Sequence, residues 1–190
     1  MSSANRNLPN RPRRALDFYA TPAWSVAEVY AGGGFPVPTL DPCAGTGALL
    51  LAAPTTRGVE LQPGLVEAAA HPRLTQGDGL ALDWHSEHIV INPPYADAMT
   101  WIAKGVVEAY SIHALVRVGF LCSQRRRRFF EDHPPAAVTF LSKRPSFFHS
   151  GPDAGRTDSA DYCWIFWDSG AWAGITRCAQ LGWIGGKRGN

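Results

Sequence analysis

The sequence predicts an α/β fold built on a buried, mainly parallel sheet. Two observations carry this prediction. From about residue 38 to residue 121, short apolar segments alternate with helix-like segments, which is typical of βαβ units. After Pro135 the pattern changes to two apolar segments with no helix between them, which indicates a hairpin-like pair at one edge of the sheet.

Each element has a local signal. A helix is expected from Thr21, as N-cap, with Pro22 in the first helical position, and glycines 32–34 end it. The expected strands are 38–41, 57–61, 74–76, 88–91, 114–121, 138–141 and 162–167. The expected helices after the first are 48–53, 64–70 and 98–110, and a polar loop is expected at 150–161.

Composition favours one globular domain. The chain has 190 residues, 45% of them hydrophobic and 18% charged, which is enough apolar material for a core. Residues 1–16 are polar and rich in Arg and Pro, so we expect a mobile basic arm followed by a single domain over 17–190. There is no apolar run of about 18 residues and no signal-peptide pattern, so we expect a cytoplasmic protein without a membrane span.

The cysteines and the charges narrow the functional classes. Cys43, Cys122, Cys163 and Cys178 form no CxxC pair and have no His at zinc-ligand spacing, so neither a metal site nor a disulfide scaffold is expected. The net charge of +2 does not identify a partner, but local basic clusters can neutralise phosphates. These clusters lie near the N-terminus, at Arg125 to Arg128, and at Lys187 and Arg188.

Polar residues follow the ends of the predicted strands. Asp41 to Gly47 reads Asp-Pro-Cys-Ala-Gly-Thr-Gly and forms a glycine-containing turn between strand and helix, where a backbone approaches a ligand closely. Glu60 ends the next strand, where a carboxylate can accept hydrogen bonds from ribose hydroxyls. Asp78 follows the third, where it could accept from the amino group of an adenine ring. A tight turn without ligand, a helix cap or a solvated loop residue is the alternative for each taken alone.

The most specific motif is Asn92-Pro93-Pro94-Tyr95, directly after the fourth strand. With the turn at Asp41 to Gly47 and the segment Phe18-Tyr19-Ala20-Thr21-Pro22, it resembles the amino-group DNA methyltransferases. The resemblance is strongest to the small adenine-specific enzymes of phages and restriction–modification systems, and it runs from about Asp17 to Asp168. That family carries an (Asn/Asp/Ser)-Pro-Pro-(Tyr/Phe/Trp) tetrapeptide at this place.

The resemblance implies a Rossmann-like, doubly wound, mainly parallel sheet of seven strands, with one antiparallel strand near the C-terminal edge. It also implies S-adenosylmethionine as cofactor and DNA as partner, with N6 of adenine as the methyl acceptor. The residues expected around the cofactor are Phe18, Tyr19, Thr21, Asp41, Cys43, Ala44, Gly45, Gly47, Glu60 and Asp78. The residues expected at the target base are Asn92, Pro93, Pro94 and Tyr95.

The chemistry suits these residue types. The adenine amine is a poor nucleophile because its lone pair is delocalised into the ring. If the Asn92 side-chain carbonyl and the Pro93 backbone carbonyl each accept one N–H, the amine can become tetrahedral and direct its lone pair at the methyl group. The prolines stiffen the loop, and Tyr95 can stack on a base that has left the helix.

Other residues are weaker candidates for DNA contact. Arg125, Arg126, Arg127 and Arg128 could contact phosphate or form a solvated helix face. Phe147 and Phe148 could stack on the base or belong to the core. No segment is long enough for a separate target-recognition domain, so short or relaxed sequence specificity is expected. Monomer and homodimer both remain open.

Three alternatives stay open at this point. Methyltransferases of RNA adenine or of protein glutamine also carry Asn-Pro-Pro-Tyr, because a planar nitrogen poses the same chemical problem. A cytosine N4 enzyme fits less well, because similar enzymes more often have Ser in place of Asn92. A catalytically silent DNA-binding relative would not need Asn92, Gly45 or Gly47.

Overall fold

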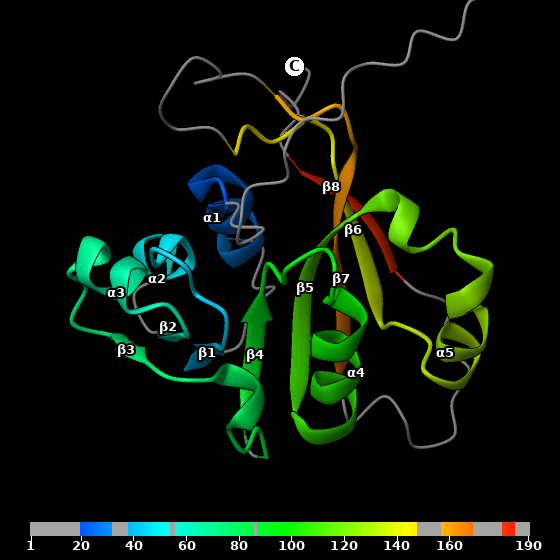
Figure 1. Ribbon diagram of the computed structural model, residues 1–190. Helices are drawn as coiled ribbons and strands as arrows, with labels where there is room; N and C mark the ends of the chain where they lie inside the picture. The colour runs from blue at the N-terminus through cyan, green and yellow to red at the C-terminus, as the bar shows by residue number, and fades with distance from the viewer. Residues whose placement is uncertain are drawn as a thin grey trace, which may run out of the picture.

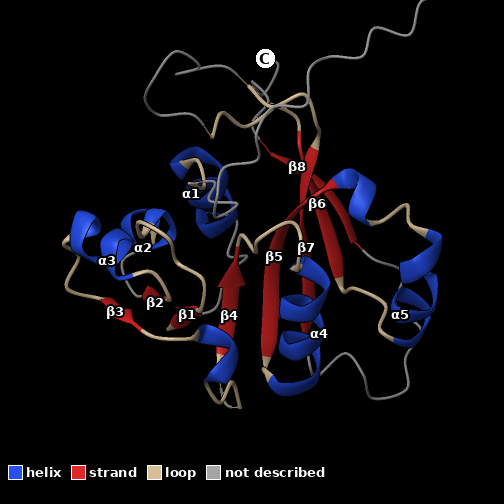
Figure 2. Cartoon of the chain, viewed as in Figure 1, coloured by secondary structure: helices blue, strands red, loops and turns tan. Residues whose placement is uncertain are grey.

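The computed structural model describes residues 20–31, 38–53, 56–85, 87–147, 157–168 and 180–184, and they form one eight-stranded sheet in the order β3-β2-β1-β4-β5-β7-β6-β8 (Figures 1 and 2). The strands are β1 (Thr39–Asp41), β2 (Thr56–Glu60), β3 (Leu74–Gln76), β4 (His88–Ile91), β5 (Ser111–Arg117), β6 (Ala137–Leu141), β7 (Tyr162–Asp168) and β8 (Gln180–Ile184). The helices are α1 (Ala23–Ala31), α2 (Ala48–Ala52), α3 (Pro63–Ala69), α4 (Ala98–Glu108) and α5 (Arg127–Asp132), with short 3₁₀ turns η1 (Gly79–Ala81), η2 (Val118–Phe120) and η3 (Gln124–Arg126).

The sheet confirms the predicted doubly wound topology. Strands β3, β2, β1, β4 and β5 are parallel neighbours, and β7 lies antiparallel between β5 and β6. Strand order reverses between β1 and β4, because the chain first builds outward through β2 and β3 and then returns to the other side of β1. The strands β1 to β7 form the sheet that the resemblance implies. In addition, β8 pairs in parallel with β6 at the edge.

The largest boundary error concerns the strand expected at 114–121. The chain pairs with β4 from Ser111 onward and leaves the sheet after Arg117. Phe120 made the pattern look strand-like, but it lies in η2, where it packs edge-on against Phe130 of α5. The helix α5 was expected only as the alternative interpretation of Arg125 to Arg128, without bounds. Both errors arise because apolar residues of a short 3₁₀ turn and of a six-residue helix have no periodicity of their own.

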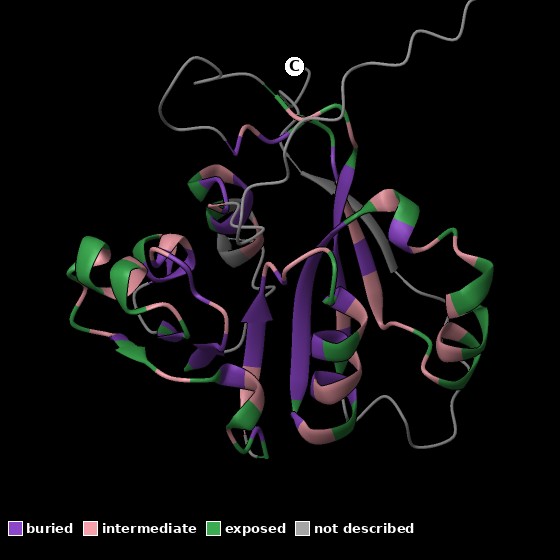
Figure 3. Cartoon of the chain, viewed as in Figure 1, coloured by how far each residue is buried: buried purple, intermediate pink, exposed green. Residues whose placement is uncertain are grey.

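Helices cover both faces of the sheet. Alternate residues of β5 point to opposite faces: Ile112 and Val116 join the cluster under α4 and α5, and Leu115 joins the cluster under α1 and α2. Figure 3 shows β4 and β5 buried along their lengths, as expected for central strands covered on both sides. Within the described residues, no helix has the length and apolar character needed to cross a membrane.

Candidate active site

A cavity of about 970 Å³ opens at the carboxyl ends of the parallel strands, where the strand order reverses. Ligands of open α/β sheets bind at this topological switch point. The cavity is lined by residues from the loops after β1, β2, β3, β4 and β5 and from the segment before α1. Lining residues that the sequence predicted are Thr21, Asp41, Cys43, Ala44, Gly45, Glu60, Asp78, Asn92, Pro94 and Tyr95.

The turn after β1 is shaped by backbone that only glycine adopts easily. Gly45 and Gly47 have φ values of 56° and 77°, in the left-handed region. The Gly47 N–H donates to the Ala44 carbonyl at 2.8 Å, which closes the turn before α2 begins. Gly79, in the loop after β3, lies so close that a Cβ there would come within 1.8 Å of the Pro42 carbonyl oxygen. Because glycine has no side chain, the segment at Gly79 can pack directly against the turn after β1.

Two buried carboxylates hold the cavity floor. Glu60 accepts the Gly45 N–H at 2.8 Å and the Gln62 N–H at 2.9 Å, so it ties the β1 turn to the end of β2. Asp41 is 2% exposed and accepts the Cys43 N–H at 3.2 Å. Burial, and then the nearby Glu60 charge, raise the pKa of Asp41 from 3.8 to about 8. A ligand with a positive charge would favour the ionised form of Asp41.

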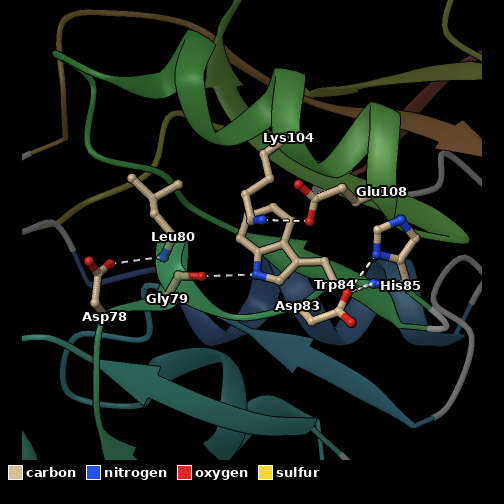
Figure 4. A network of polar contacts seen from close by, with 8 residues as sticks. All are labelled: Asp78, Gly79, Leu80, Asp83, Trp84, His85, Lys104 and Glu108. Atoms are coloured by element: carbon tan, nitrogen blue, oxygen red, sulfur yellow. Dashed lines mark hydrogen bonds and ion pairs between the residues drawn. The ribbon is translucent and has the colours of Figure 1, made fainter.

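Asp78 lines the cavity and also caps η1, accepting the Leu80 N–H at 3.0 Å (Figure 4). Asp78 is therefore both a helix cap and a lining residue of the cavity. The two roles are compatible because a carboxylate has lone pairs for more than one donor. The buried Trp84 fixes this loop, because its indole N–H donates to the Gly79 carbonyl at 2.9 Å. Lys104 of α4 lies 5.0 Å from the centre of the Trp84 ring.

The Asn92 tetrapeptide leaves the end of β4 beside the β1 turn. The Cys43 thiol points to the Asn92 main-chain carbonyl, with the sulfur 3.8 Å from the oxygen. Burial, and then the Asp41 charge, raise the pKa of the Cys43 thiol, so the residue is a poor nucleophile. Beyond the buried Pro93, the Asp97 N–H donates to the Pro94 carbonyl at 3.1 Å as the chain turns into α4.

Tyr95 is held by a polar network with strand β7. Its hydroxyl lies 3.0 Å from the Tyr162 hydroxyl, which donates to Asp158 at 2.6 Å and accepts from Arg117 Nε at 3.0 Å. Arg117 Nη2 also donates to Asp158 at 3.1 Å. Because the Tyr162 proton goes to Asp158, Tyr95 must be the donor in the tyrosine pair. Burial, and then the hydrogen bond to Asp158, raise the pKa of Tyr162 to about 12.

Several predicted residues lie elsewhere. Pro93 and Gly47 shape their turns without lining the cavity, and Phe18, Tyr19, Phe148 and residues 1–16 lie outside the described residues. Phe147 is 3% exposed and packs edge-on against Tyr162, with ring centres 5.1 Å apart, so the structure places it in the core. Arg125 to Arg128 lie in η3 and at the start of α5, which leads into the amino end of β6, away from the cavity mouth. There Arg127 and Arg128 pair with acidic residues one helical turn on.

The structure adds lining residues that sequence reasoning missed: Leu61, Gln62, Leu65, Leu80, Trp101 and Arg117. Leu61 is 64% exposed although it is apolar, and it directly follows Glu60. Arg117 ends β5 beside β4, so a charged residue at the end of a buried apolar strand was the available signal. That signal was lost because the strand was expected to continue to residue 121.

A histidine and two acidic residues form a cluster outside the cavity. Potential ligand atoms of Asp83, His85 and Glu108 lie within 4.8 Å of one another, although they share no sequence spacing (Figure 4). Lys104 donates to Glu108 at 2.5 Å and so already supplies a cation to this group. His85 hydrogen-bonds Asp83 at 2.6 Å on the exposed surface, so contacts within the protein account for the cluster.

No protein-family model matches this sequence, and no curated protein matches it in sequence. Solved structures do match. A candidate RNA methyltransferase from Pyrococcus horikoshii has 16% identity and a TM-score of 0.59, over 80% of this chain and 88% of that one. A candidate class I S-adenosylmethionine-dependent methyltransferase from Listeria monocytogenes has 15% identity and a TM-score of 0.64, over 90% and 67%.

A third structure, the modification subunit of a candidate type I restriction enzyme from Vibrio vulnificus, has 16% identity and a TM-score of 0.54, over 91% of this chain and 48% of that one. Identities this low establish the arrangement of the chain alone. The strand order, the antiparallel β7 and these likenesses agree: the chain has the Rossmann-like fold found in S-adenosylmethionine-dependent methyltransferases.

Proposed function

We propose that this protein is an S-adenosylmethionine-dependent methyltransferase that acts on the exocyclic N6 amine of adenine in DNA, with short or relaxed sequence specificity. The observation that carries the proposal is a single cavity that joins the Asp41–Gly47 turn to the Asn92–Tyr95 tetrapeptide. The two segments touch where the Cys43 thiol meets the Asn92 carbonyl. A binding turn and an amine-activating loop thus lie within reach of one ligand.

The cavity fits the cofactor in size and charge. A volume of about 970 Å³ lies at the upper end of the range of small-molecule sites, which leaves room for a cofactor and part of a target base. Glu60 lies where ribose hydroxyls are bound at strand ends, and Asp78 and the apolar Leu80 also line the cavity. Glu60 supplies negative potential for a sulfonium and an ammonium group, and Asp41, whose pKa burial raises to about 8, adds to it when a cationic ligand displaces its proton.

The bound cofactor supplies a methyl group on a positively charged sulfur. When bound, it would transfer this methyl group to the acceptor nitrogen, with sulfur keeping the electrons of the broken bond and the nitrogen giving up one proton. Asn92, which lines the cavity, offers a side-chain carbonyl oxygen that would accept an amine N–H, and Pro93 stiffens the loop that holds it. The chain thus contributes orientation and electrostatic stabilisation and no strong base.

The choice of DNA rests on the resemblance of Phe18 to Pro22 and of the tetrapeptide to the amino-group DNA methyltransferases. The similar solved structures include one named as an RNA methyltransferase and one named as the modification subunit of a type I restriction enzyme. Tyr95 supports a base as acceptor, because its ring borders the cavity next to Asn92 and every base has a face to stack on it.

The test is transfer of labelled methyl from S-adenosylmethionine to unmethylated duplex DNA, RNA and a protein extract, followed by digestion and mass identification of the product. We expect N6-methyladenine in DNA. Asn92→Ala should lower the rate by a factor of about 10³ and retain cofactor binding, because it removes a carbonyl that acts on the transition state. Glu87→Gln, at a partly buried residue that pairs with Arg57 and does not line the cavity, is the control and should retain the wild-type rate.

Label in RNA or protein alone would overturn the DNA assignment and leave the methyltransferase assignment in place. Cofactor binding without transfer to any acceptor would favour the catalytically silent relative. Absence of cofactor binding would overturn the proposal as a whole.

A further inference from the structure

Arg117 is the single cation among the described residues that line the cavity. The charged residues that share the lining with it are Asp41, Glu60, Asp78 and Asp97. Arg117 ends β5, the strand next to β4, so it stands beside the tetrapeptide and on the opposite side of it from β1. A cavity that is otherwise acidic therefore has one point that attracts an anion, and that point is on the side of Tyr95.

The guanidinium is held in one orientation. Its Nε donates to the Tyr162 hydroxyl at 3.0 Å and its Nη2 to Asp158 at 3.1 Å. Its Cζ lies 4.7 Å from the centre of the Tyr95 ring, within the range of a cation–π contact. Arg117 thus occupies one face of Tyr95, and a stacked base must use the other face. The same contacts fix the guanidinium and the ring relative to each other.

The anchored group keeps donors for a ligand. A guanidinium has five N–H groups, and the bonds to Tyr162 and Asp158 use two of them. Asp158 is shared between Arg117 and the Tyr162 hydroxyl, so it satisfies the charge of Arg117 only in part. The Arg117 side chain remains 46% exposed at the cavity wall, which is the arrangement of a cation that can take a second anionic partner.

Resting on the proposed function, we propose that Arg117 binds a backbone phosphate of the nucleotide whose base stacks on Tyr95, with Tyr162 and Asp158 as the residues that position it. A phosphodiester matches the planar fork of Arg, which binds two oxygens at once. A nucleotide that leaves the stack carries its own phosphates with it, so an anion near the ring face follows from its chemistry. A glutamine side chain would bring no such anion. Arg117 is thereby a determinant for nucleic acid over protein.

The experiment measures binding of a labelled duplex, in the presence of S-adenosylhomocysteine, at several salt concentrations. Arg117→Gln should weaken binding about tenfold and lower the salt slope by about one, because one phosphate contact is lost. Arg57→Gln is the matched control: Arg57 also has a carboxylate partner, Glu87, but does not line the cavity, so its slope should equal that of the wild type. Affinity for S-adenosylmethionine should not change in either variant.

Arg117→Lys separates the effect of the positive charge from the effect of the planar guanidinium, and it also controls for loss of folding. It should restore most of the salt slope, because a lysine still neutralises one phosphate, but should not restore the full affinity. A duplex with one uncharged methylphosphonate beside the target adenine should bind wild type and Arg117→Gln equally. If the affinity difference between wild type and Arg117→Gln disappears only when the methylphosphonate is at this position, Arg117 contacts that phosphate.

The outcomes separate the two proposals. DNA binding with an Arg117-dependent slope but without methyl transfer sustains the phosphate site and overturns the enzyme. Methyl transfer with an unchanged slope in Arg117→Gln sustains the enzyme and overturns the phosphate site. Loss of cofactor affinity in Arg117→Gln, with DNA binding unchanged, also overturns it, since Arg117 would then hold the cofactor carboxylate.

Discussion

The two halves of the sheet on either side of β4 are built differently. On one side, β1 and β3 have three residues each, and β1 and β2 end in the buried Asp41 and Glu60, the second of which accepts a backbone N–H of the β1 turn. On the other side, β5 and β7 have seven residues each and are buried almost throughout (Figure 3). The largest buried cluster takes Leu40, Val59 and Trp84 from the first half and most of its remaining side chains from the second.

The difference shows how binding and stability are divided in this chain. The loops after β1, β2 and β3 form the expected cofactor side of the cavity from polar groups whose burial costs free energy unless they are paired. The long strands β5 and β7 provide the rigid support on which Arg117 and Tyr162 are fixed. Substitutions in the first half should therefore affect ligand binding first, and substitutions in the second should affect the free energy of unfolding first.

The largest effect is expected for Gly79→Ala. The new Cβ would lie 1.8 Å from the Pro42 carbonyl oxygen, a backbone atom that moves only with the β1 turn. We expect a loss of about 3 kcal/mol or more in unfolding free energy and loss of cofactor binding. Urea denaturation and calorimetric titration with S-adenosylmethionine measure the two effects.

Two other glycines serve as matched controls for Gly79→Ala. At Gly105 in α4 a Cβ would meet the flexible end of Ile112 at 2.4 Å, so Gly105→Ala should cost about 1–2 kcal/mol and leave cofactor binding intact. Gly64→Ala meets no atom within 4 Å and should stabilise α3 by up to about 1 kcal/mol. Equal cofactor affinity in Gly79→Ala and Gly105→Ala would contradict the division between the halves.

Glu60→Gln is expected to have the second largest effect. Its two carboxylate oxygens accept N–H groups from Gly45 and Gln62, and an amide cannot accept both, because its nitrogen is a donor. We expect a loss of about 3 kcal/mol in unfolding free energy and a rise of about a hundredfold in the cofactor Kd. The exposed Glu67→Gln on α3 is the control. A variant with unchanged Kd would show that Glu60 is a purely structural tie.

Much of this division could be predicted from the sequence. The strands at 74–76 and 88–91 were placed as observed, and the Asp41–Gly47 turn and the tetrapeptide were placed at strand ends that meet in one cavity. This succeeded because strand–turn–helix signals are local and because parallel strands present their carboxyl ends at the same edge of the sheet.

What could not be predicted depends on contacts far apart in the chain. The bond between Tyr95 and Tyr162 joins residues 67 positions apart, and Arg117 reaches Asp158 across 41. Nothing local in the sequence marks such pairs. The same holds for Phe147, which is apolar both as a base-stacking residue and as a core residue, and only the packing against Tyr162 distinguishes the two.

Asp41 should make the stability of the first half depend on pH. Because its pKa in the folded protein is about 8 and that of an unfolded Asp is 3.8, the folded state holds the proton between these values. Stability from this group is present below pH 4 and is lost as the pH rises toward 8. The difference in unfolding free energy between wild type and Asp41→Asn should therefore change by about 1.4 kcal/mol per pH unit between pH 6.5 and 8. A constant difference over that range would contradict a protonated Asp41.

A buried histidine in the opposite half of the sheet should show the reverse dependence of stability on pH. There, burial lowers the pKa of His113 to about 3, so its contribution to the free energy of unfolding is complete above its ordinary pKa of 6.5 and is lost at lower pH.

Cofactor binding should release a proton from Asp41 near pH 7, since the cationic ligand favours the carboxylate. Titration calorimetry in two buffers of different ionisation enthalpy measures this proton, and Asp41→Asn should not release it.

The smallest effect is expected for Tyr162→Phe, because Tyr162 lies in the apolar half and reaches the cavity only through the lining residues Tyr95 and Arg117. The ring and its packing against Phe147 remain, and the hydroxyl that joins Tyr95, Arg117 and Asp158 is lost. We expect a cost of about 1 kcal/mol in unfolding free energy. The KM for DNA should rise several-fold with little change in cofactor Kd, because the hydroxyl orients the groups that meet the acceptor and none that meets the cofactor. Tyr110→Phe, on a half-exposed side chain outside the cavity, should change neither constant. A Tyr162→Phe enzyme that loses cofactor affinity would place the boundary between the two functions elsewhere than at β4.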